Sequence, residues 1–584
     1  MFSKVFYILE KKFLKSIILL FFLLLLSTFF ELISIGSIPI FLMTIIDPEA
    51  SLNKLPFLTN IEFFKLDESS DLIYLIGIAL IFVFFIKNSF LTFLAYFQGK
   101  LRQRVRETIK KKIIGMYLFL PYKYHLEINP ASLARNITHD SVLTSDATFI
   151  MVNIIKELFV LLGIFLLLFF TTPPITVGLV LILSFVSYFF YFLIKNRVKK
   201  SGKEFREAAG YELKNLFQTF GSIKETKILS RENYFFSLLK KNLKKIENAK
   251  FLVGFISAMP RLFLEVVTVI GIIIVPLSYI GMGYEVQEIL PYLALFVACA
   301  LRMIPAFNTI TSQLTSFKVL NASVTSIYDE LKKYSLLKNK EKISLTTNLK
   351  KNIDKIIIND LNFSYEKDIP VLKNISLSIS IGEKIGILGK SGSGKSTFVD
   401  LLLGLHLPDS GKIIVNEFNI QDDLRLWQSK IGYLPQSLYL FDDTILNNIT
   451  YGLSKDDIDF EMFNECLKIS NITNFVNNLK DKENTTIGNN GVRISGGEKQ
   501  RIGIARALYN KPELLIFDES TSSLDSENEK IIMNEIDNLD YDCTKIIISH
   551  KLNPLLNCNK IYVFDNGKII KSGTLEEIRK DYLI

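Results

Sequence analysis

The chain has 584 residues, of which 49% are hydrophobic and 22% are charged, and its formal net charge is +9 at pH 7. A basic balance of this kind suits a nucleic-acid ligand, but here the Lys and Arg runs alternate with long apolar stretches, so no nucleic acid is expected as a partner. The four cysteines lack C-x-x-C spacing, which excludes a disulfide framework and a zinc site of that type.

The apolar residues gather before residue 315, in runs long enough to cross a membrane. A helix needs roughly 20 apolar residues to span the ~30 Å hydrocarbon layer. The first run is too long for the apolar region of a cleaved signal peptide and is predicted to remain as an anchor. Residues 1–314 are therefore predicted to form an all-α transmembrane domain with six spans, at about 16–46, 71–98, 149–170, 173–195, 252–281 and 289–314.

The charge between the spans predicts their orientation. Segments 99–147 and 195–250 are rich in Lys and Arg, whereas 47–71 is mostly acidic. Because cytoplasmic segments carry an excess of positive charge, the amino terminus and both basic segments are expected in the cytoplasm, with the chain in a bacterial inner membrane. Apolar residues recur at helical spacing in both basic segments, so the spans are expected to continue as helices beyond the bilayer.

Residues 315–350 are rich in Lys, Asn and Ser and are interpreted as a linker to a second cytoplasmic domain, 351–584. That domain contains a phosphate-binding loop of the G-x-x-x-x-G-K-[ST] type. Glycines in such a loop let backbone N–H groups approach phosphate oxygens at the start of a helix. Lys395 is expected to reach the β- and γ-phosphates, and the Ser396 hydroxyl to bind Mg²⁺. The loop comprises Gly389, Lys390, Ser391, Gly392, Ser393, Gly394, Lys395, Ser396 and Thr397.

Two further elements follow the loop in a set order. A serine–glycine turn occupies Ile494–Glu498, and an apolar strand at 514–519 ends in Asp518 and Glu519. The three elements in this order resemble the ATPase domain of ATP-binding-cassette (ABC) transporters, an α/β P-loop domain. The resemblance implies ATP and Mg²⁺ as cofactors and ATP hydrolysis as the activity.

The resemblance also implies a role for each motif residue. Asp518 is expected to bind Mg²⁺ and Glu519 to act as the general base, since a carboxylate can accept the proton of the attacking water. Tyr365 is expected to stack on adenine. Gln436 stands at the family's Q-loop, where it would contact Mg²⁺ or the attacking water, and His550 stands where the switch region contacts the γ-phosphate.

The serine–glycine turn matches the family's signature run except at its two ends. Ser495, Gly496 and Gly497 are expected to bind the γ-phosphate of ATP held by the other subunit. Ile494 and Glu498 replace the Leu and Gln of the common form. Glu498 keeps the length and an acceptor, so activity is expected, although a negative charge near phosphate would slow it.

The resemblance covers the whole chain. Apolar spans fused to one cassette are the arrangement of an ABC exporter half that works as a homodimer, because importers keep their ATPase on a separate chain. Ser522–Asp525 matches the family's D-loop, whereas Asn489 stands where exporters usually carry an acid, which weakens the coupling role expected of that loop. Two alternatives remain: a multidrug or peptide exporter, and an ATP-gated regulator without hydrolysis. The intact Glu519 argues against the regulator.

Charged residues within the apolar runs point to the substrate. A charge at mid-bilayer costs ~2.5–3.5 kcal/mol, so each needs a partner, water or a function. Arg261 and Glu265 are four apart and can neutralise each other on one helix face. Lys87 and Arg302 have no partner in their own helices. Lys87, Arg261 and Arg302 are therefore predicted to form a cationic patch for an anionic head group, with placement at the membrane interface or ion pairing as the alternative.

A closer resemblance agrees with an anionic lipid. Met259–Glu265 and Leu301–Pro305, together with Val399–Leu401 and Tyr433–Phe441 of the cassette, look like the bacterial lipid-linked oligosaccharide flippase of protein N-glycosylation. In that family, basic cavity residues are thought to handle the substrate's pyrophosphate. The resemblance implies flipping of a membrane lipid, a polyprenyl-pyrophosphate-type oligosaccharide, from the cytoplasmic to the outer leaflet.

Overall fold

The computed structural model describes residues 2–46, 69–171, 192, 208, 211–212, 214–281, 283, 286–338, 353–366, 369–488, 491, 493–519 and 526–582. The chain divides into two compact units. The first comprises residues 1–120 and 124–340, and the second comprises 121–123 and 341–584. The first is helical and the second is α/β, which confirms the predicted fold class.

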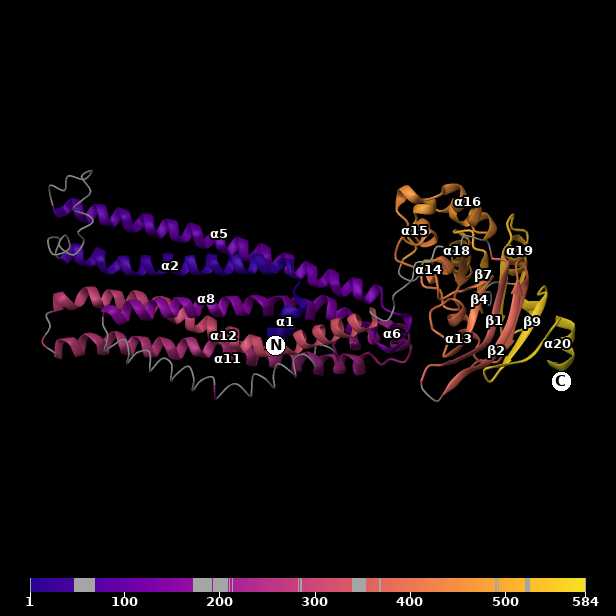
Figure 1. The fold of residues 1–584 in the computed structure, drawn as a ribbon, viewed down its shortest axis with the longest axis horizontal. Coiled ribbons are helices and arrows are strands. Elements are labelled where there is room, and N and C mark those ends of the chain that lie inside the picture. The colour runs from indigo at the N-terminus through magenta and orange to yellow at the C-terminus, as the bar shows by residue number, and fades with distance from the viewer. Residues whose placement is uncertain are drawn as a thin grey trace. The chain divides into compact units, whose positions relative to one another are not determined.

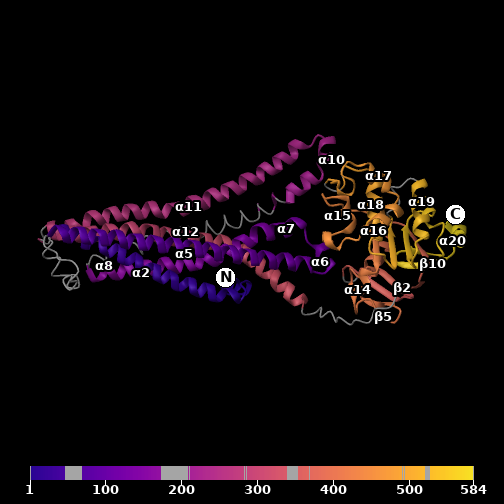
Figure 2. The ribbon, with the colours of Figure 1, turned by 90° about the horizontal axis from the view of Figure 1, so that it is seen from above.

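Long helices lie side by side in the first unit (Figures 1 and 2). Helix α12 packs against α8, α2 and α11, and α2 packs against α5. A π-helix, Asn136–Asp140, leads directly into α8. The helices are α1 (Phe2–Ile8), α2 (Lys12–Ile46), α5 (Ser69–Leu118), α6 (Tyr122–Glu127), α7 (Pro130–Arg135), α8 (Ser141–Thr171), α10 (Ile223–Ile228), α11 (Glu232–Gly281) and α12 (Val286–Lys338).

Several of these helices are much longer than a bilayer is thick. Helix α5 has 50 residues, which makes it about 75 Å long at ~1.5 Å per residue, against ~30 Å of hydrocarbon. Among the described residues, four helices are long and apolar enough to cross a membrane, at 12–46, 71–118, 130–171 and 289–314. The expected fifth span lies within α11. The expected fourth, 173–195, falls almost wholly outside the described residues.

The expected linker at 315–350 is helical as far as Lys338, because α12 continues through it without a break. Polar composition suggested a linker, but apolar residues recur at helical spacing and are buried. These are Leu320, Val324, Ile327 and Leu331, which pack in one cluster with side chains of α5. Pro305 lies inside the same helix, one turn after Leu301.

The second unit contains two sheets. A four-stranded antiparallel sheet has the order β2-β1-β4-β5, and a six-stranded sheet has the order β10-β9-β3-β8-β7-β6. In the larger sheet β6, β7, β8, β3 and β9 run parallel, and β10 is antiparallel to β9. The strands are β1 (Lys355–Ser364), β2 (Pro370–Ser380), β3 (Lys384–Gly389), β4 (Ser410–Val415), β5 (Phe418–Asn419), β6 (Ile431–Leu434), β7 (Leu514–Asp518), β8 (Thr544–Ser549), β9 (Lys560–Asp565) and β10 (Lys568–Gly573).

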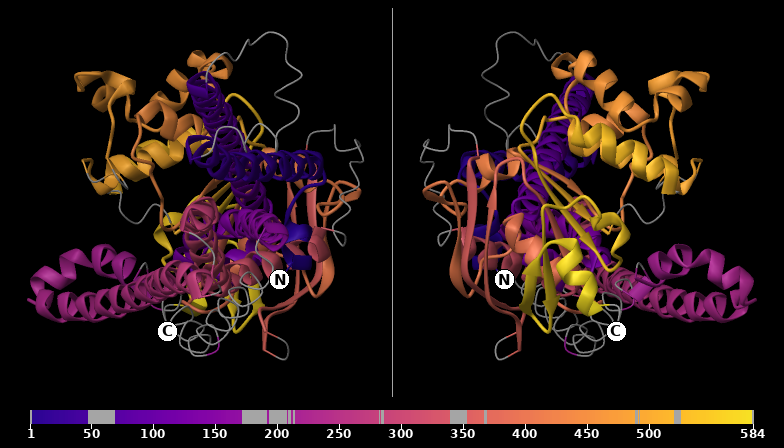
Figure 3. Two further views of the ribbon diagram at one scale, coloured as in Figure 1. Left: turned by 90° about the vertical axis from the view of Figure 1, so that its left-hand side faces the viewer. Right: turned by 90° about the vertical axis from the view of Figure 1, so that its right-hand side faces the viewer.

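Helices cover the larger sheet, and α20 packs on β9 and β10 (Figure 3). Strands β3, β7 and β8 are buried along their whole length, as parallel strands between two layers are. Their carboxyl ends meet at one edge of the sheet, where ligands of such sheets bind. The helices are α13 (Lys395–Leu402), α14 (Leu424–Ser429), α15 (Ile445–Thr450), α16 (Phe460–Ile469), α17 (Thr473–Asn478), α18 (Gly496–Leu508), α19 (Ser526–Asp537) and α20 (Leu575–Tyr582).

Candidate functional site

The phosphate-binding loop joins β3 to α13, as the motif predicts. Gly394 adopts a φ of +101°, and a Cβ there would lie 2.7 Å from Leu372, so only glycine fits the turn into α13. The Lys395 ammonium donates hydrogen bonds to the carbonyl oxygens of Gly389 at 2.8 Å and Lys390 at 3.0 Å. The loop therefore holds the lysine across its own opening, beside the positions that phosphate oxygens would take.

Three predicted residues converge on the carboxylate of a fourth, Glu519. Oxygens of Glu519 lie 3.6 Å from Lys395 Nζ and 3.6 Å from His550 Nδ1, and the Gln436 amide donates a hydrogen bond to Glu519 Oε2 at 2.9 Å. These residues come from α13, the end of β7, the end of β8 and the segment after β6. A cavity of about 440 Å³ is lined by Gly389, Lys390, Ser391, Glu519 and His550, together with Leu388.

The backbone at Glu519 is itself constrained. Its φ of +48° is in the left-handed region, which is uncommon for a residue other than glycine. A hydrogen bond from its N–H to the Ile548 carbonyl oxygen, 3.1 Å long, ties this conformation to β8. The strained position turns the carboxylate out of the strand and toward Gln436 and His550, which fits a group that must meet a reacting water.

Asp518 lies in a more buried acidic environment than its neighbour. Burial and the nearby Glu519 charge raise the pKa of Asp518, and the Tyr433 hydroxyl donates to Asp518 Oδ2 at 3.4 Å. Burial and the Asp518 charge raise the pKa of Asp400 to about 6. Asp400 was not predicted as a site residue. It lies five residues after Lys395 on α13, and this short spacing is what could have pointed to it.

Oxygen ligands of this kind suit a hard cation. Mg²⁺ is usually held by one or two carboxylates together with substrate phosphates. The Asp518 carboxylate and the exposed Ser396, beside Lys395 at the start of α13, would offer oxygen ligands of this kind together with the phosphates of ATP. The residues present therefore fit Mg²⁺.

Tyr365 lies beside the phosphate loop. Its hydroxyl is 3.2 Å from Thr397 Oγ1, and 39% of the residue is exposed. An exposed ring next to the loop is available for stacking on a base. Adenine stacking remains a prediction.

The serine–glycine turn opens α18, but it does not line the cavity that contains Glu519. The Ser495 hydroxyl accepts from the Glu498 N–H at 3.3 Å, and the Glu498 carboxylate accepts from the Ser495 N–H at 2.7 Å, which is a capping box. Ser495 and Gly496 are exposed. Glu498 thus has a structural use at the helix start, which the sequence comparison with Gln did not reveal. Asn489 and Ser522–Asp525 lie outside the described residues.

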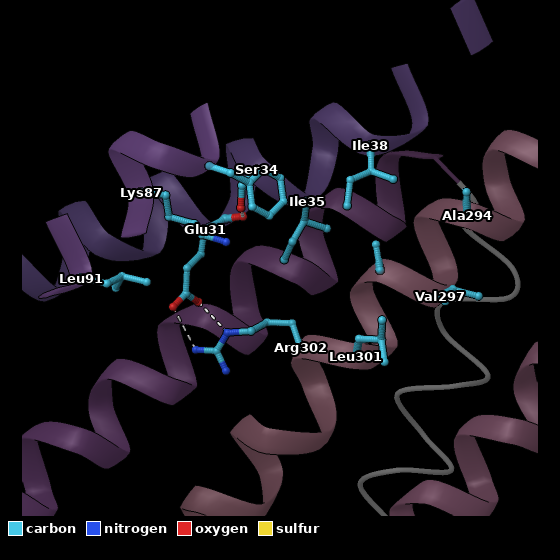
Figure 4. A pocket seen from close by; sticks show the side chains of 12 residues that line it. Glu31, Ser34, Ile35, Ile38, Lys87, Leu91, Ala294, Val297, Leu301 and Arg302 are labelled. Atoms are coloured by element: carbon cyan, nitrogen blue, oxygen red, sulfur yellow. Dashed lines mark hydrogen bonds and ion pairs between the residues drawn. The ribbon is translucent and has the colours of Figure 1, made fainter. Parts of the chain in front are cut away.

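A second site lies in the helical unit, where Arg302 of α12 is paired (Figure 4). Its Nε and Nη2 lie 2.7 and 3.1 Å from the two oxygens of Glu31 on α2, and Nη2 also lies 3.0 Å from Glu157 on α8. Of the two readings of Arg302, a free cation for an anionic head group or an ion-paired residue, the contacts favour ion pairing. Its partners come from other helices, and both acids are buried.

A pocket of about 580 Å³ adjoins this ion pair (Figure 4). Its polar lining comes from Glu31, Lys87 and Arg302, and the rest is mostly apolar, with Ile35 and Phe84 among the lining residues. The Lys87 ammonium lies 4.2 Å from the centre of the Phe84 ring. Lys87 and Arg302 both line this pocket, and their predicted role in binding an anionic head group stays a prediction.

The third predicted cation, Arg261, is on another helix. It lies on α11, but its side chain is outside the described residues, while Glu265 on the same helix is exposed. The proposed pairing of these two residues stays a prediction.

Comparison with known proteins agrees with both units. Residues 372–522 match the ABC transporter family model. The ATP-dependent lipid A-core flippase of Francisella tularensis subsp. tularensis (strain FSC 198) is 27% identical over 522 residues, covering 88% of this chain and 84% of the relative. That of Vibrio vulnificus (strain YJ016) is 26% identical over 487 residues and covers 81% of each chain.

A solved structure extends the likeness to the fold of the whole chain. A bacterial Atm1-family ABC exporter with ATP bound has a TM-score of 0.78 at 18% identity, over 98% of this chain and 97% of the other. The described apolar helices make this a multi-pass membrane protein. The chain thus combines a helical membrane-type domain with one cassette that matches the ABC transporter model, and these likenesses support ATP-hydrolysing translocase activity.

Proposed function

We propose that the chain flips a phosphate-bearing lipid, specifically a lipid-linked oligosaccharide with a polyprenyl-pyrophosphate-type head group, from the cytoplasmic to the outer leaflet of a bacterial inner membrane. The observation that supports this is the pocket in the helical unit, where Lys87 lies beside an apolar wall while Glu31 and Glu157 neutralise Arg302. An amphipathic ligand suits such a lining. The relatives named as lipid A-core flippases support a lipid substrate.

The energy source in this proposal is Mg–ATP bound by two copies of the chain. Lys395 and the loop amides bind the phosphates, Ser396 and Asp518 hold Mg²⁺, and Gln436 and His550 orient the groups around Glu519. Ser495 stands at the start of α18, away from the cavity lined by Glu519 and His550. A homodimer in which each copy contributes Ser495 to the other's ATP would complete both sites.

Complementation between two inactive variants tests the homodimer. Lys395→Ala chains and Ser495→Ala chains should each lose ATPase activity alone. Mixed dimers should recover activity, because one of their two composite sites combines an intact Lys395 with an intact Ser495. The measurement is steady-state ATP hydrolysis after reconstitution of the mixture. Mixtures no more active than either parent would contradict sites shared between subunits.

The substrate is tested by flipping in proteoliposomes. Lys87→Ala should reduce flipping of a lipid-linked oligosaccharide about tenfold or more, since a hydrogen bond to a charged group contributes ~1.5–3 kcal/mol. Basal ATPase activity should stay near that of the wild type. Lys100→Ala, which removes a lysine of the same helix outside the pocket, is the matched control.

Parallel transport assays with other substrates separate the alternative functions. Lipid A-core, a zwitterionic phospholipid and a cationic drug are offered in parallel with the lipid-linked oligosaccharide. Transport of lipid A-core alone would reassign the lipid, and transport of the drug alone would favour a multidrug exporter. Unchanged flipping by Lys87→Ala would remove this pocket as the head-group site.

A further inference from the structure

A basic pocket lies at the other end of the α2–α5 pair, far along both helices from Glu31 and Lys87. It has a volume of about 660 Å³ and is formed by the start of α2, by Glu10 two residues before it and by the later part of α5. Its charged lining comprises Glu10, Lys12, Arg104, Glu107, Lys111 and Lys112. On α5 the basic residues recur at helical spacing, so one face of the helix presents them together.

The acids of this basic pocket are already neutralised. Lys12 Nζ lies 2.6 Å from Glu10 Oε2, and Lys111 Nζ lies 2.7 Å from Glu107 Oε1. Four cations against two acids leave a net charge of +2. Within the described part of the chain, no ion pair joins Arg104 or Lys112 to any residue, and both are exposed. The surplus positive charge is therefore available to an anion from outside.

The position of the basic pocket along the helices indicates where that anion comes from. Helix α2 becomes apolar after Lys15 and Ser16, with Ile18 and Leu19 about half exposed. The apolar part of α5, residues 71–98, ends just before Arg104. The pocket thus sits where hydrocarbon-facing surface gives way to polar surface, which is the depth of lipid head groups.

We propose that this basic pocket binds the phosphate head of an anionic phospholipid of the surrounding bilayer. Arg104 offers a planar fork that matches two phosphate oxygens, and Lys112 adds a second charge. The acyl chains would lie along the exposed apolar surface around Ile18 and Leu19. The site is separate from the substrate pocket and does not depend on what the chain transports.

Native mass spectrometry of the full chain, released from nanodiscs of phosphatidylcholine with phosphatidylglycerol, tests the proposal. The wild type should retain phosphatidylglycerol in preference to phosphatidylcholine. The double variant Arg104→Gln, Lys112→Gln should lose most of this preference, whereas Arg104→Lys, which keeps the charge, should lose less. Lys100→Gln with Lys110→Gln is the matched control, because it removes two charges from the same helix outside the pocket.

Each outcome bears on the proposal. ATP hydrolysis measured on the same samples should be retained in all variants, which shows that the chains are folded. Equal retention of phosphatidylglycerol by the pocket variant and the wild type would overturn the site. Loss in the Lys100, Lys110 control as well would reduce it to nonspecific charge attraction. Displacement of the lipid by millimolar inorganic phosphate would assign the site to a soluble anion instead.

Discussion

Glu519→Gln should abolish ATP turnover while leaving ATP binding intact. Glutamine keeps the size of the side chain and can still hydrogen-bond to Gln436, but it cannot accept a proton from water. Loss of a general base costs about 10²–10⁴-fold in rate. The measurement is steady-state ATPase activity of the purified protein, alongside equilibrium binding of a fluorescent ATP analogue.

A distant acid of the same unit provides the control. Glu576→Gln makes the same chemical change at an exposed position of α20 and should leave hydrolysis unchanged. If Glu519→Gln hydrolysed ATP at the wild-type rate, Glu519 would not be the base. If it failed to bind ATP, its role would be in holding the loop through Lys395, from which it lies 3.6 Å.

Arg302→Ala should destabilise the helical unit strongly. The change leaves Glu31 and Glu157 buried without their common cation, and removing one partner of a buried ion pair costs about 3–5 kcal/mol. The measurement is thermal unfolding in detergent. Arg231→Ala, which removes an exposed arginine between α10 and α11, should change the midpoint little.

Neutralising the acids tests the reason for this loss. The triple variant Glu31→Gln, Glu157→Gln, Arg302→Leu should recover much of the stability, since neither carboxylate is left charged and only Lys156, which is 3.5 Å from Glu157 and partly exposed, loses a partner. A single Arg302→Ala variant as stable as the wild type would mean that water or lipid reaches the carboxylates. In that case a lipid head group could enter the pocket at Lys87 without first breaking a stabilising ion pair of Glu31.

Local motifs made the ATPase site predictable. The nine residues of the phosphate loop are contiguous, so their spacing alone predicts a strand, a turn and a helix. Asp518 ends a buried parallel strand, Glu519 and His550 each directly follow one, and the carboxyl ends of such strands meet at one edge. The left-handed backbone of Glu519 and the environment of Asp400 were not predictable, because both depend on neighbours distant in the sequence.

The membrane domain was predictable in its helices but not in their contacts. Apolar length reveals a span, yet nothing local pairs Arg302 with acids 271 and 145 residues earlier in the chain. Burial of Leu320 and Leu331 likewise depends on α5 and outweighs the polar composition that suggested a linker. Tertiary packing decided both outcomes.

Helix α12 is continuous over its whole length, so a rotation at one end would be transmitted to the other. Its 53 residues make a rod about 80 Å long, so a rotation of ~5° about one end would move the other by roughly 7 Å. Proline lacks the N–H that would bond one turn back, so the rod, which also contains Pro291, can bend at Pro305. Arg302 lies just before that point and is ion-paired to Glu31 of α2 and Glu157 of α8, so α12 would pivot there. The part of α12 that follows Pro305 would then rotate about the ion-paired Arg302, which also lines the pocket at Lys87.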